Sequence, residues 1–401
     1  MSTAIDATIE AITPDLVALR RDLHAHPETG FEEHRTAGIV ARLLRDWGLA
    51  VTEGVGRTGV VGTLTGSRPP TSNLGPRAIG LRADMDALNI LEATGLPYAS
   101  TVPGKMHACG HDGHTTMLLG AAQALARHRD FAGTVHFIFQ PAEEGIGGGQ
   151  AMLADGLLQR FPVESLYGMH NWPGMPVGRF GSREGPMMAA GDTWTVTLRG
   201  TGGHGGAGAH LATDVTVAQA QLVMALQTIV SRNVPALQSA VVSVGHIAGG
   251  IWDSPNVIPA ELVVRGTARC FDERIRALLE RRMGELAQSI AAAHGCTAEL
   301  RYERIFDVLV NDPARTATAL AVALDLVGEA AVDAAVQPLT GSEDFSFMLG
   351  QCPGNYIMIG NGVAEDGSYR PVHTPLYDFN DAALPLGVRY WTALVQRELG
   401  G

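Results

Sequence analysis

The amino-terminal half of the chain alternates short apolar segments with longer segments whose apolar residues recur every three or four positions. The short segments have the length and composition of buried strands, and the longer ones have helical periodicity. Strands that alternate with helices usually pair in parallel, because each helix crosses back over the sheet. The expected strands are Val60–Leu64, Ala78–Arg82, Thr134–Gln140 and Ser165–Met169, and the expected helices are Thr36–Trp47 and Thr115–His128. The fold class is therefore α/β, with a mostly parallel sheet.

Two local signals add to this outline. Thr13 can cap a helix in which Pro14 is the first residue. The segment from Gly66 to Gly75 is rich in proline, serine and glycine, which is typical of a surface loop.

The pattern changes near residue 188. Thr193–Leu198 alternates strictly between polar and apolar residues, as a half-buried strand does. The segments that follow predict the order β-α-β-β-α-β, which is that of a small α+β sandwich. We therefore expect residues 188–309 to form an inserted domain, and residues 1–187 and 310–401 to form the larger, catalytic domain.

Composition argues against several classes of protein. The 401 residues are 46% hydrophobic and 17% charged, which is sufficient for a buried core. The net charge of −12 disfavours binding to nucleic acid or to an anionic membrane surface. Apolar stretches are shorter than a membrane span, and the four scattered cysteines are typical of a reducing compartment. We expect a cytoplasmic protein that binds neither nucleic acid nor membrane.

The densest group of reactive side chains lies in Met106–His114, which reads Met-His-Ala-Cys-Gly-His-Asp-Gly-His. Cys109 and His111 are separated by one glycine, so a thiolate and an imidazole can reach the same cation. Zinc, manganese, cobalt and nickel accept this combination of ligands. The alternative interpretation is a histidine-rich turn at the start of a helix, with Asp112 as its cap.

A pair of acids follows the strand expected at Thr134–Gln140. Isolated acidic pairs are usually solvated, but Glu143 and Glu144 lie in Pro-Ala-Glu-Glu-Gly directly after this apolar segment. One carboxylate can bind a metal while its neighbour holds a water as a general base. His170 follows another strand, and ligand sites in open α/β sheets lie at the carboxyl ends of the strands. His373 could complete the set, or could instead stabilise a turn.

At these residues the chain resembles the metal-dependent amidohydrolase family that contains hippurate hydrolase, bacterial N-acyl-amino-acid aminoacylases and plant auxin-conjugate hydrolases. The resemblance runs nearly end to end, and Cys-Gly-His followed by Glu-Glu is its most specific part. The segments that carry it are His-Ala-His-Pro-Glu at 24–28, Arg-Ala-Asp-Met-Asp-Ala-Leu at 82–88, the 106–114 segment, Gln-Pro-Ala-Glu-Glu-Gly at 140–145, Gly-Met-His-Asn-Trp-Pro at 168–173, Gly-Gly-His at 202–204, Asn-Val-Ile-Pro at 256–259, Gly-Ser-Glu-Asp-Phe at 341–345 and His-Thr-Pro at 373–375.

The resemblance implies a site for two divalent metal ions, which could be zinc, manganese, cobalt or nickel. The ligands that it implies are Cys109, His111, Glu144, His170 and His373. Glu143 would be the general base that takes a proton from metal-bound water and passes it to the leaving amine. Asp86 resembles an acid that orients one of the ligands, with a helix cap or a turn as the alternative role.

In the same family the inserted domain serves as a lid and forms a dimer, so a homodimer or higher homo-oligomer is expected. A histidine of its Gly-Gly-His segment reaches the partner's active site and stabilises the oxyanion; the matching residue is His204. Asn256 and Arg269 match positions that hold the substrate carboxylate or shape the cleft, and the planar fork of arginine suits a carboxylate. The loop after His204 lacks the family's usual Pro-His pair and is one residue longer, so we expect it to be more flexible.

Three functions fit these observations. The first is hydrolysis of small N-acyl or N-aroyl L-amino acids such as hippurate, which releases a carboxylic acid and an amino acid. The second is dipeptidase or carboxypeptidase activity on the same two-metal scaffold. The third is metal or ligand binding without catalysis, which would not require Glu143 beside Glu144. The resemblance favours the first.

Overall fold

By its internal contacts the chain divides into two compact units. The computed structural model describes residues 3–69 and 77–400, so most of the loop expected over 66–75 lies outside the described residues. The first unit comprises Met1–Gly185, Val310–Gln337 and Asp344–Gly401, and the second comprises Pro186–Leu309 and Pro338–Glu343. The domain boundaries inferred at residues 188 and 309 stay a prediction, which limited proteolysis would test.

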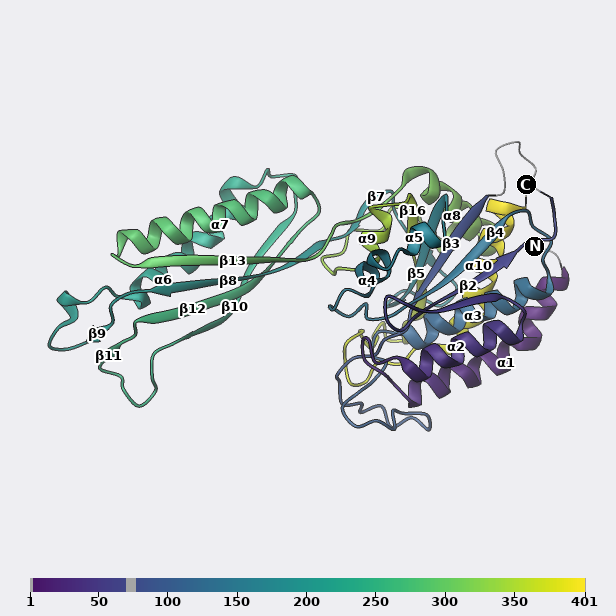
Figure 1. The fold of residues 1–401 in the computed structure, drawn as a ribbon, viewed down its shortest axis with the longest axis horizontal. Coiled ribbons are helices and arrows are strands. Elements are labelled where there is room, and N and C mark those ends of the chain that lie inside the picture. The colour runs from purple at the N-terminus through teal and green to yellow at the C-terminus, as the bar shows by residue number, and fades with distance from the viewer. Residues whose placement is uncertain (1–2, 70–76, 401) are drawn as a thin grey trace. The chain divides into compact units, whose positions relative to one another are not determined.

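The first unit is built around an eight-stranded sheet whose four central strands are parallel (Figure 1). In spatial order these strands are β4 (Thr134–Gln140), β3 (Ala78–Asp84), β5 (Ser165–Pro173) and β16 (Gly354–Gly362). The flanking strands are β2 (Gly59–Thr65) and β1 (Ala50–Val55) on one side, and β6 (Phe180–Gly181) and β15 (Val332–Asp333) on the other. The expected α/β class is confirmed. Strand β3 extends beyond its expected end to include Asp84, and β5 extends to include His170.

Helices cover this sheet with their apolar faces. α3 (His111–Arg127) packs on the central strands, α10 (Leu384–Leu399) packs beside it, and α1 (Thr3–Ala25) contacts both of these helices. Further helices of this unit are α2 (His34–Asp46), α4 (Gly148–Ala154), α5 (Leu157–Arg160), α8 (Pro313–Val327) and α9 (Phe345–Leu349). Within the described residues, no helix is both long enough and apolar enough to cross a bilayer.

Helix α1 begins well before the expected start at Pro14, so that expectation was wrong. Pro14 lies inside the helix, and the Thr13 hydroxyl donates to the Ile9 carbonyl at 2.7 Å instead of capping. A proline inside a helix costs about 3 kcal/mol. Burial of Ile5, Ile9 and Ile12, at about 1.5–3 kcal/mol each, outweighs that cost. Helix α3 also begins earlier than expected, at His111 rather than at residue 115.

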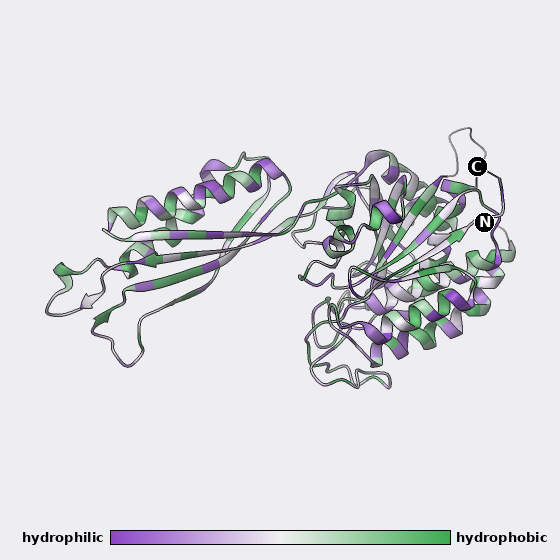
Figure 2. Cartoon of the chain, in the orientation of Figure 1, coloured by the Kyte–Doolittle hydropathy of each residue, from purple (hydrophilic) through white to green (hydrophobic). Residues whose placement is uncertain are grey.

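The second unit contains a four-stranded antiparallel sheet with two helices packed on it (Figure 1). Its elements follow in the order β8 (Ala190–Arg199), α6 (Val215–Thr228), β10 (Ala240–Gly249), β12 (Glu261–Cys270), α7 (Glu273–Ala293) and β13 (Thr297–Phe306). Trp194, Val196 and Leu198, the apolar face of β8, are fully buried against the helices. Helix α7 packs on this apolar face, and Figure 2 shows hydrophilic and hydrophobic residues alternating along the helix.

Candidate metal centre

The carboxyl ends of the parallel strands bring together side chains from four separate segments. The Cys109 Sγ lies 3.4 Å from the His170 Nε2, and the His373 Nε2 lies 3.1 Å from a Glu144 carboxylate oxygen. Cys109 belongs to two groups whose ligand atoms all lie within 4.8 Å of one another, one with His111 and His170 and one with Glu144 and His373. All five expected ligands therefore meet in one place, with the thiol common to both groups.

The donor atoms of this cluster suit a borderline divalent cation. Among the described residues, the buried His111 Nε2 has no hydrogen-bond partner, and the nearest Asp84 oxygen is 3.9 Å away. A buried imidazole nitrogen without a partner is destabilising unless something binds it. A thiolate, imidazoles and a carboxylate together favour zinc, cobalt, nickel or manganese over magnesium or calcium. The donor groups present thus fit divalent ions of this kind, and Cys109 belongs to both groups of donors.

The charges of the cluster depend on one another. Burial raises the pKa of the Cys109 thiol, and the nearby Glu144 carboxylate raises it further. Hydrogen bonds to Cys109 and Glu144 raise the pKa of His373 to about 10. Burial and the neighbouring His114 lower the pKa of His170. Cations favour thiolate and neutral imidazole, so metal binding here would release protons.

Two buried acids beside the expected ligands make different contacts. Asp86 is buried, with one oxygen 3.2 Å from the His111 Nδ1 and the other accepting the Glu144 N–H at 3.0 Å. It can thereby hold the His111 ring with Nε2 towards the cluster. Glu143 is also buried and offers a carboxylate oxygen within 4.8 Å of ligand atoms of His111 and Glu144. The Glu143 carboxylate therefore lies next to two of the expected ligands.

A chain of hydrogen bonds supports the segment next to His170, and it was not predicted from the sequence. It is formed by Asp84, His114, Asn171 and Tyr377. The His114 Nδ1 lies 2.7 Å from an Asp84 oxygen, and the Asn171 backbone N–H donates to the His114 Nε2 at 2.9 Å. The Tyr377 hydroxyl donates to the Asn171 side chain at 2.7 Å. These contacts fix the end of β5, where His170 lies. The sequence carried one signal for the position of His114. It follows His111 by three residues, so the two histidines lie one helical turn apart.

Two of the three expected residues of the second unit, His204 and Asn256, lie close together. His204 lies in β9 (Gly203–His204), which pairs with β11 (Val257–Ile258) to form a two-stranded ribbon. Asn256 is the residue directly before β11. Two backbone N–H groups, of Gly206 and Ala207, donate to the His204 Nδ1 at 3.1 Å each. Since Nδ1 is an acceptor, the proton lies on Nε2, and exposed His204 presents a hydrogen-bond donor.

Arg269 is separated from this ribbon. It lies near the end of β12, whereas the ribbon adjoins the start of that strand, about 26 Å away at the usual rise per residue. The guanidinium is half-buried, and its Nη1 donates to the Thr267 hydroxyl and, at 2.8 Å, to the Ala268 carbonyl. Burial lowers its pKa. Within the second unit of a single chain, His204 and Asn256 therefore lie close together, and Arg269 lies apart from them.

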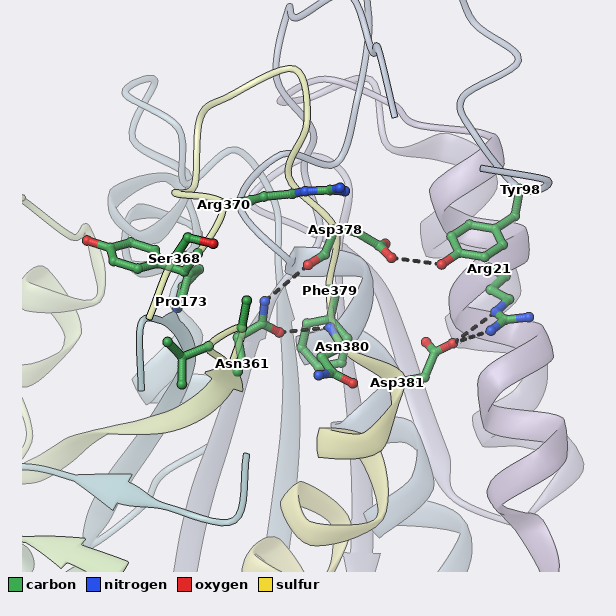
Figure 3. A pocket seen from close by; sticks show the side chains of 14 residues that line it. Arg21, Tyr98, Pro173, Asn361, Ser368, Arg370, Asp378, Phe379, Asn380 and Asp381 are labelled. Carbon is green, nitrogen blue, oxygen red and sulfur yellow. Dashed lines mark hydrogen bonds and ion pairs between the residues drawn. The ribbon is translucent and has the colours of Figure 1, made fainter. Parts of the chain in front are cut away.

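A pocket of about 630 Å³ lies at the ends of β5 and β16 (Figure 3). Its acids are already paired: Asp378 accepts the Tyr98 hydroxyl at 2.7 Å, and Asp381 accepts the Arg21 Nε at 2.9 Å. The Asn361 amide donates to the Asp378 carbonyl at 3.1 Å. None of the five expected ligands is among the described residues that line it. These bonds order the segment between residues 361 and 381, which also carries His373.

Comparison with known proteins agrees with the resemblance to metal-dependent amidohydrolases. Residues 80–397 match peptidase family M20/M25/M40. Hippurate hydrolase of Campylobacter jejuni is 39% identical over 95% of this chain and 96% of its own length. N-acetylcysteine deacetylase of Bacillus subtilis is 37% identical over 94% of this chain and 95% of its own length. The structure of the Bacillus subtilis YxeP protein, described as a dinuclear metal-binding peptidase of the M20 family, is similar with a TM-score of 0.83, 32% identity and coverage of 98% and 99%.

The chain therefore belongs to peptidase family M20/M25/M40. It is an enzyme, a metal-dependent amidohydrolase, and its cluster of thiol, imidazole and carboxylate groups fits the two metal ions of such a site.

Proposed function

We propose that this enzyme hydrolyses the amide bond of N-acyl or N-aroyl L-amino acids, with hippurate-like compounds as substrates. The observation that carries this proposal is the buried Glu143 carboxylate beside a cluster fit for two metal ions. The hippurate and N-acetylcysteine hydrolases among its relatives support this substrate class.

The reaction would use residues of the first unit in distinct roles. Cys109, His111, Glu144, His170 and His373 would hold two divalent ions of zinc, manganese, cobalt or nickel. Bound there, the ions would polarise the amide carbonyl and lower the pKa of water towards neutrality. Glu143 would take the proton from the attacking water and hand it to the nitrogen of the leaving amino acid. Asp86 would keep the His111 ring and the Glu144 backbone in place.

The second unit would supply groups that recognise the substrate. His204 carries its proton on Nε2, so it can donate to the oxyanion that develops on the amide carbonyl. Asn256 adjoins His204 in the ribbon and would contact the same substrate. Arg269 would bind the substrate carboxylate or shape the cleft. Because the structure separates it from His204, we propose that these two residues of one chain serve different active sites.

This arrangement requires a homodimer, which we place on the second unit. β10 is an edge strand of its sheet, so its outer backbone groups can pair with another strand. Ile247 on β10 and Val217 and Met224 on α6 are large apolar side chains that are 47–72% exposed. A second copy of the same surface would cover them. Light scattering of the Ile247→Lys/Met224→Glu double variant should give a monomer, and an unchanged mass would contradict this interface.

A peptidase function is the alternative, and the description of the YxeP protein favours it. A panel of N-acyl amino acids, N-aroyl amino acids and simple dipeptides, assayed with each defined metal, separates the two. The proposal predicts a kcat/KM for hippurate-like substrates at least tenfold above that for dipeptides. The reverse order would make the enzyme a dipeptidase, and activity that survives verified metal depletion would reject the metal mechanism.

The cytoplasm remains the proposed compartment. All four cysteines are buried and free, which suits reducing conditions. Fractionation of cells that express the full chain would test this.

A further inference from the structure

A buried carboxylate outside the metal cluster holds the loop that carries Glu143. Glu33 is fully buried; its Oε1 accepts the Ala142 N–H at 2.8 Å, and its Oε2 accepts the Thr58 hydroxyl at 2.6 Å. Ala142 directly precedes Glu143 and has a φ of 54°, in the left-handed region. That conformation costs a non-glycine residue about 1–2 kcal/mol. The carboxylate of Glu33 therefore supports a strained residue immediately before the proposed base.

The start of helix α2 does not require this carboxylate. Glu33 precedes the helix, but its side chain makes no capping bond. Glu28 performs that role, because its two oxygens accept the Arg35 and Thr36 N–H groups at 2.9 and 2.8 Å. Burial is the largest influence on Glu33 and raises its pKa. A buried acid is destabilising without hydrogen bonds, and the bonds that Glu33 makes lead to the loop and to Thr58.

Two other acids accept backbone N–H groups further along the chain, one in the same loop and one at the start of α4. The Glu144 N–H donates to Asp86 at 3.0 Å, and the Gly149 N–H donates to Asp344 at 2.8 Å. The Asp344 N–H in turn lies 3.4 Å from a Glu143 oxygen. Asp86 also contacts a proposed metal ligand, whereas Glu33 touches the loop on the side before the base. Glu33 is therefore the anchor whose loss should displace Glu143 with the least direct effect on the ligands.

We propose that Glu33 is a positioning residue for Glu143. Its carboxylate fixes the Ala142 amide, and this sets the orientation of the Glu143 side chain that follows. The proposal rests on the proposed hydrolysis with Glu143 as its base. A displacement of about 1 Å at a reacting group can lower a rate about 100-fold. Loss of Glu33 should therefore act on kcat, while KM and the number of bound ions change little.

The test compares Glu33→Ala and Glu33→Gln with Glu32→Gln as the matched control. Glu33→Ala should lower kcat about 10- to 100-fold with KM within about twofold and two ions retained. Glu33→Gln should stay within about threefold of the wild type, because its amide oxygen still accepts from Ala142 and its NH₂ can donate to the Thr58 hydroxyl. Glu32 is exposed and bonded to Lys105 and Thr29, so Glu32→Gln should be unchanged.

Hydrogen exchange gives a readout that does not depend on turnover. Amides of the peptide that contains Ala142 to Glu144 should exchange about tenfold faster in Glu33→Ala, and at the wild-type rate in Glu33→Gln. Wild-type kcat and exchange in Glu33→Ala would overturn the proposal, as would parallel loss of kcat and metal. If Glu33→Ala does not fold, Thr58→Val, which removes one bond to Glu33, must show the same kcat-specific loss at smaller size. An active Glu143→Gln would instead reject the proposed function itself.

Discussion

The proposed metal cluster of the first unit and the His204 ribbon of the second differ in which parts of the chain hold their side chains. In the cluster, His111 is buried against Asp86, and Glu144 bonds through its backbone to the same acid. In the ribbon, two backbone amides of the same loop donate to Nδ1 of exposed His204, which leaves Nε2 as its donor nitrogen. The cluster side chains are therefore held by contacts with other segments of the chain, whereas the ring of His204 is held by hydrogen bonds from its own loop.

Buried charge also has different roles in the two units. In the first, acids such as Asp86 and Glu33 bind backbone amides of the loop that carries Glu143 and Glu144. In the second, the guanidinium of Arg276 binds Asp192 at 2.9 Å inside the core under the sheet. The first arrangement serves the site, and the second serves the stability of its own unit.

The largest effect is expected from Glu143→Gln. The amide keeps the shape of the side chain but cannot accept a proton, so kcat should fall about 10²- to 10⁴-fold. Elemental analysis should still find two ions, because Glu143 is not one of the expected ligands. Near-normal turnover would remove the proposed base, and loss of metal would make Glu143 a ligand.

The ribbon is tested by His204→Ala, which should lower kcat about 10²- to 10³-fold, the usual loss for one oxyanion donor. His204 is exposed, so metal content and melting temperature should not change. His34→Ala, at an exposed histidine of the first unit, is the control and should be fully active. An active His204→Ala variant would leave the ribbon without a catalytic role.

The core of the second unit is tested by Arg276→Met. Removal of one partner from a buried ion pair leaves Asp192 uncompensated and should destabilise the fold by about 3–5 kcal/mol in urea. Arg274→Met, at an exposed arginine paired with Asp272, should change stability by less than about 0.5 kcal/mol. Loss of bound metal in Arg276→Met without loss of stability would contradict the division of roles.

A pH dependence of stability should come from the first unit. Burial by itself would lower the pKa of His24, but its bonds to Asp112 and Glu92 outweigh burial and raise the pKa from 6.5 to about 9. The protonated ring therefore stabilises the fold fully below pH 6.5, and this contribution, about 3 kcal/mol at most, is lost as the pH rises to about 9. Urea unfolding across this range should show a steeper decline for the wild type than for His24→Gln. Equal slopes would contradict the assignment.

The sequence could predict the strands and the cluster because both depend on local patterns. Cys109, Glu144 and His170 each lie close to the end of an apolar segment or the start of a helix, and parallel strands bring such positions together. Glu33 could not be predicted, because its partner is a backbone amide whose left-handed conformation arises only in the folded loop. The protonated nitrogen of His204 likewise depends on the turn that follows it. The helix start predicted at Thr13 was wrong, because the capping signal is local. It carries no information on the burial of Ile5, Ile9 and Ile12, which extends the helix towards the amino terminus.

The most direct test of the central claim is anomalous X-ray diffraction from crystals grown with manganese or zinc. The account predicts two metal peaks, one beside His170 and one beside His373, with the Cys109 sulfur between them. A single peak elsewhere in the protein, or none among these residues at saturating metal, would contradict the two-metal centre.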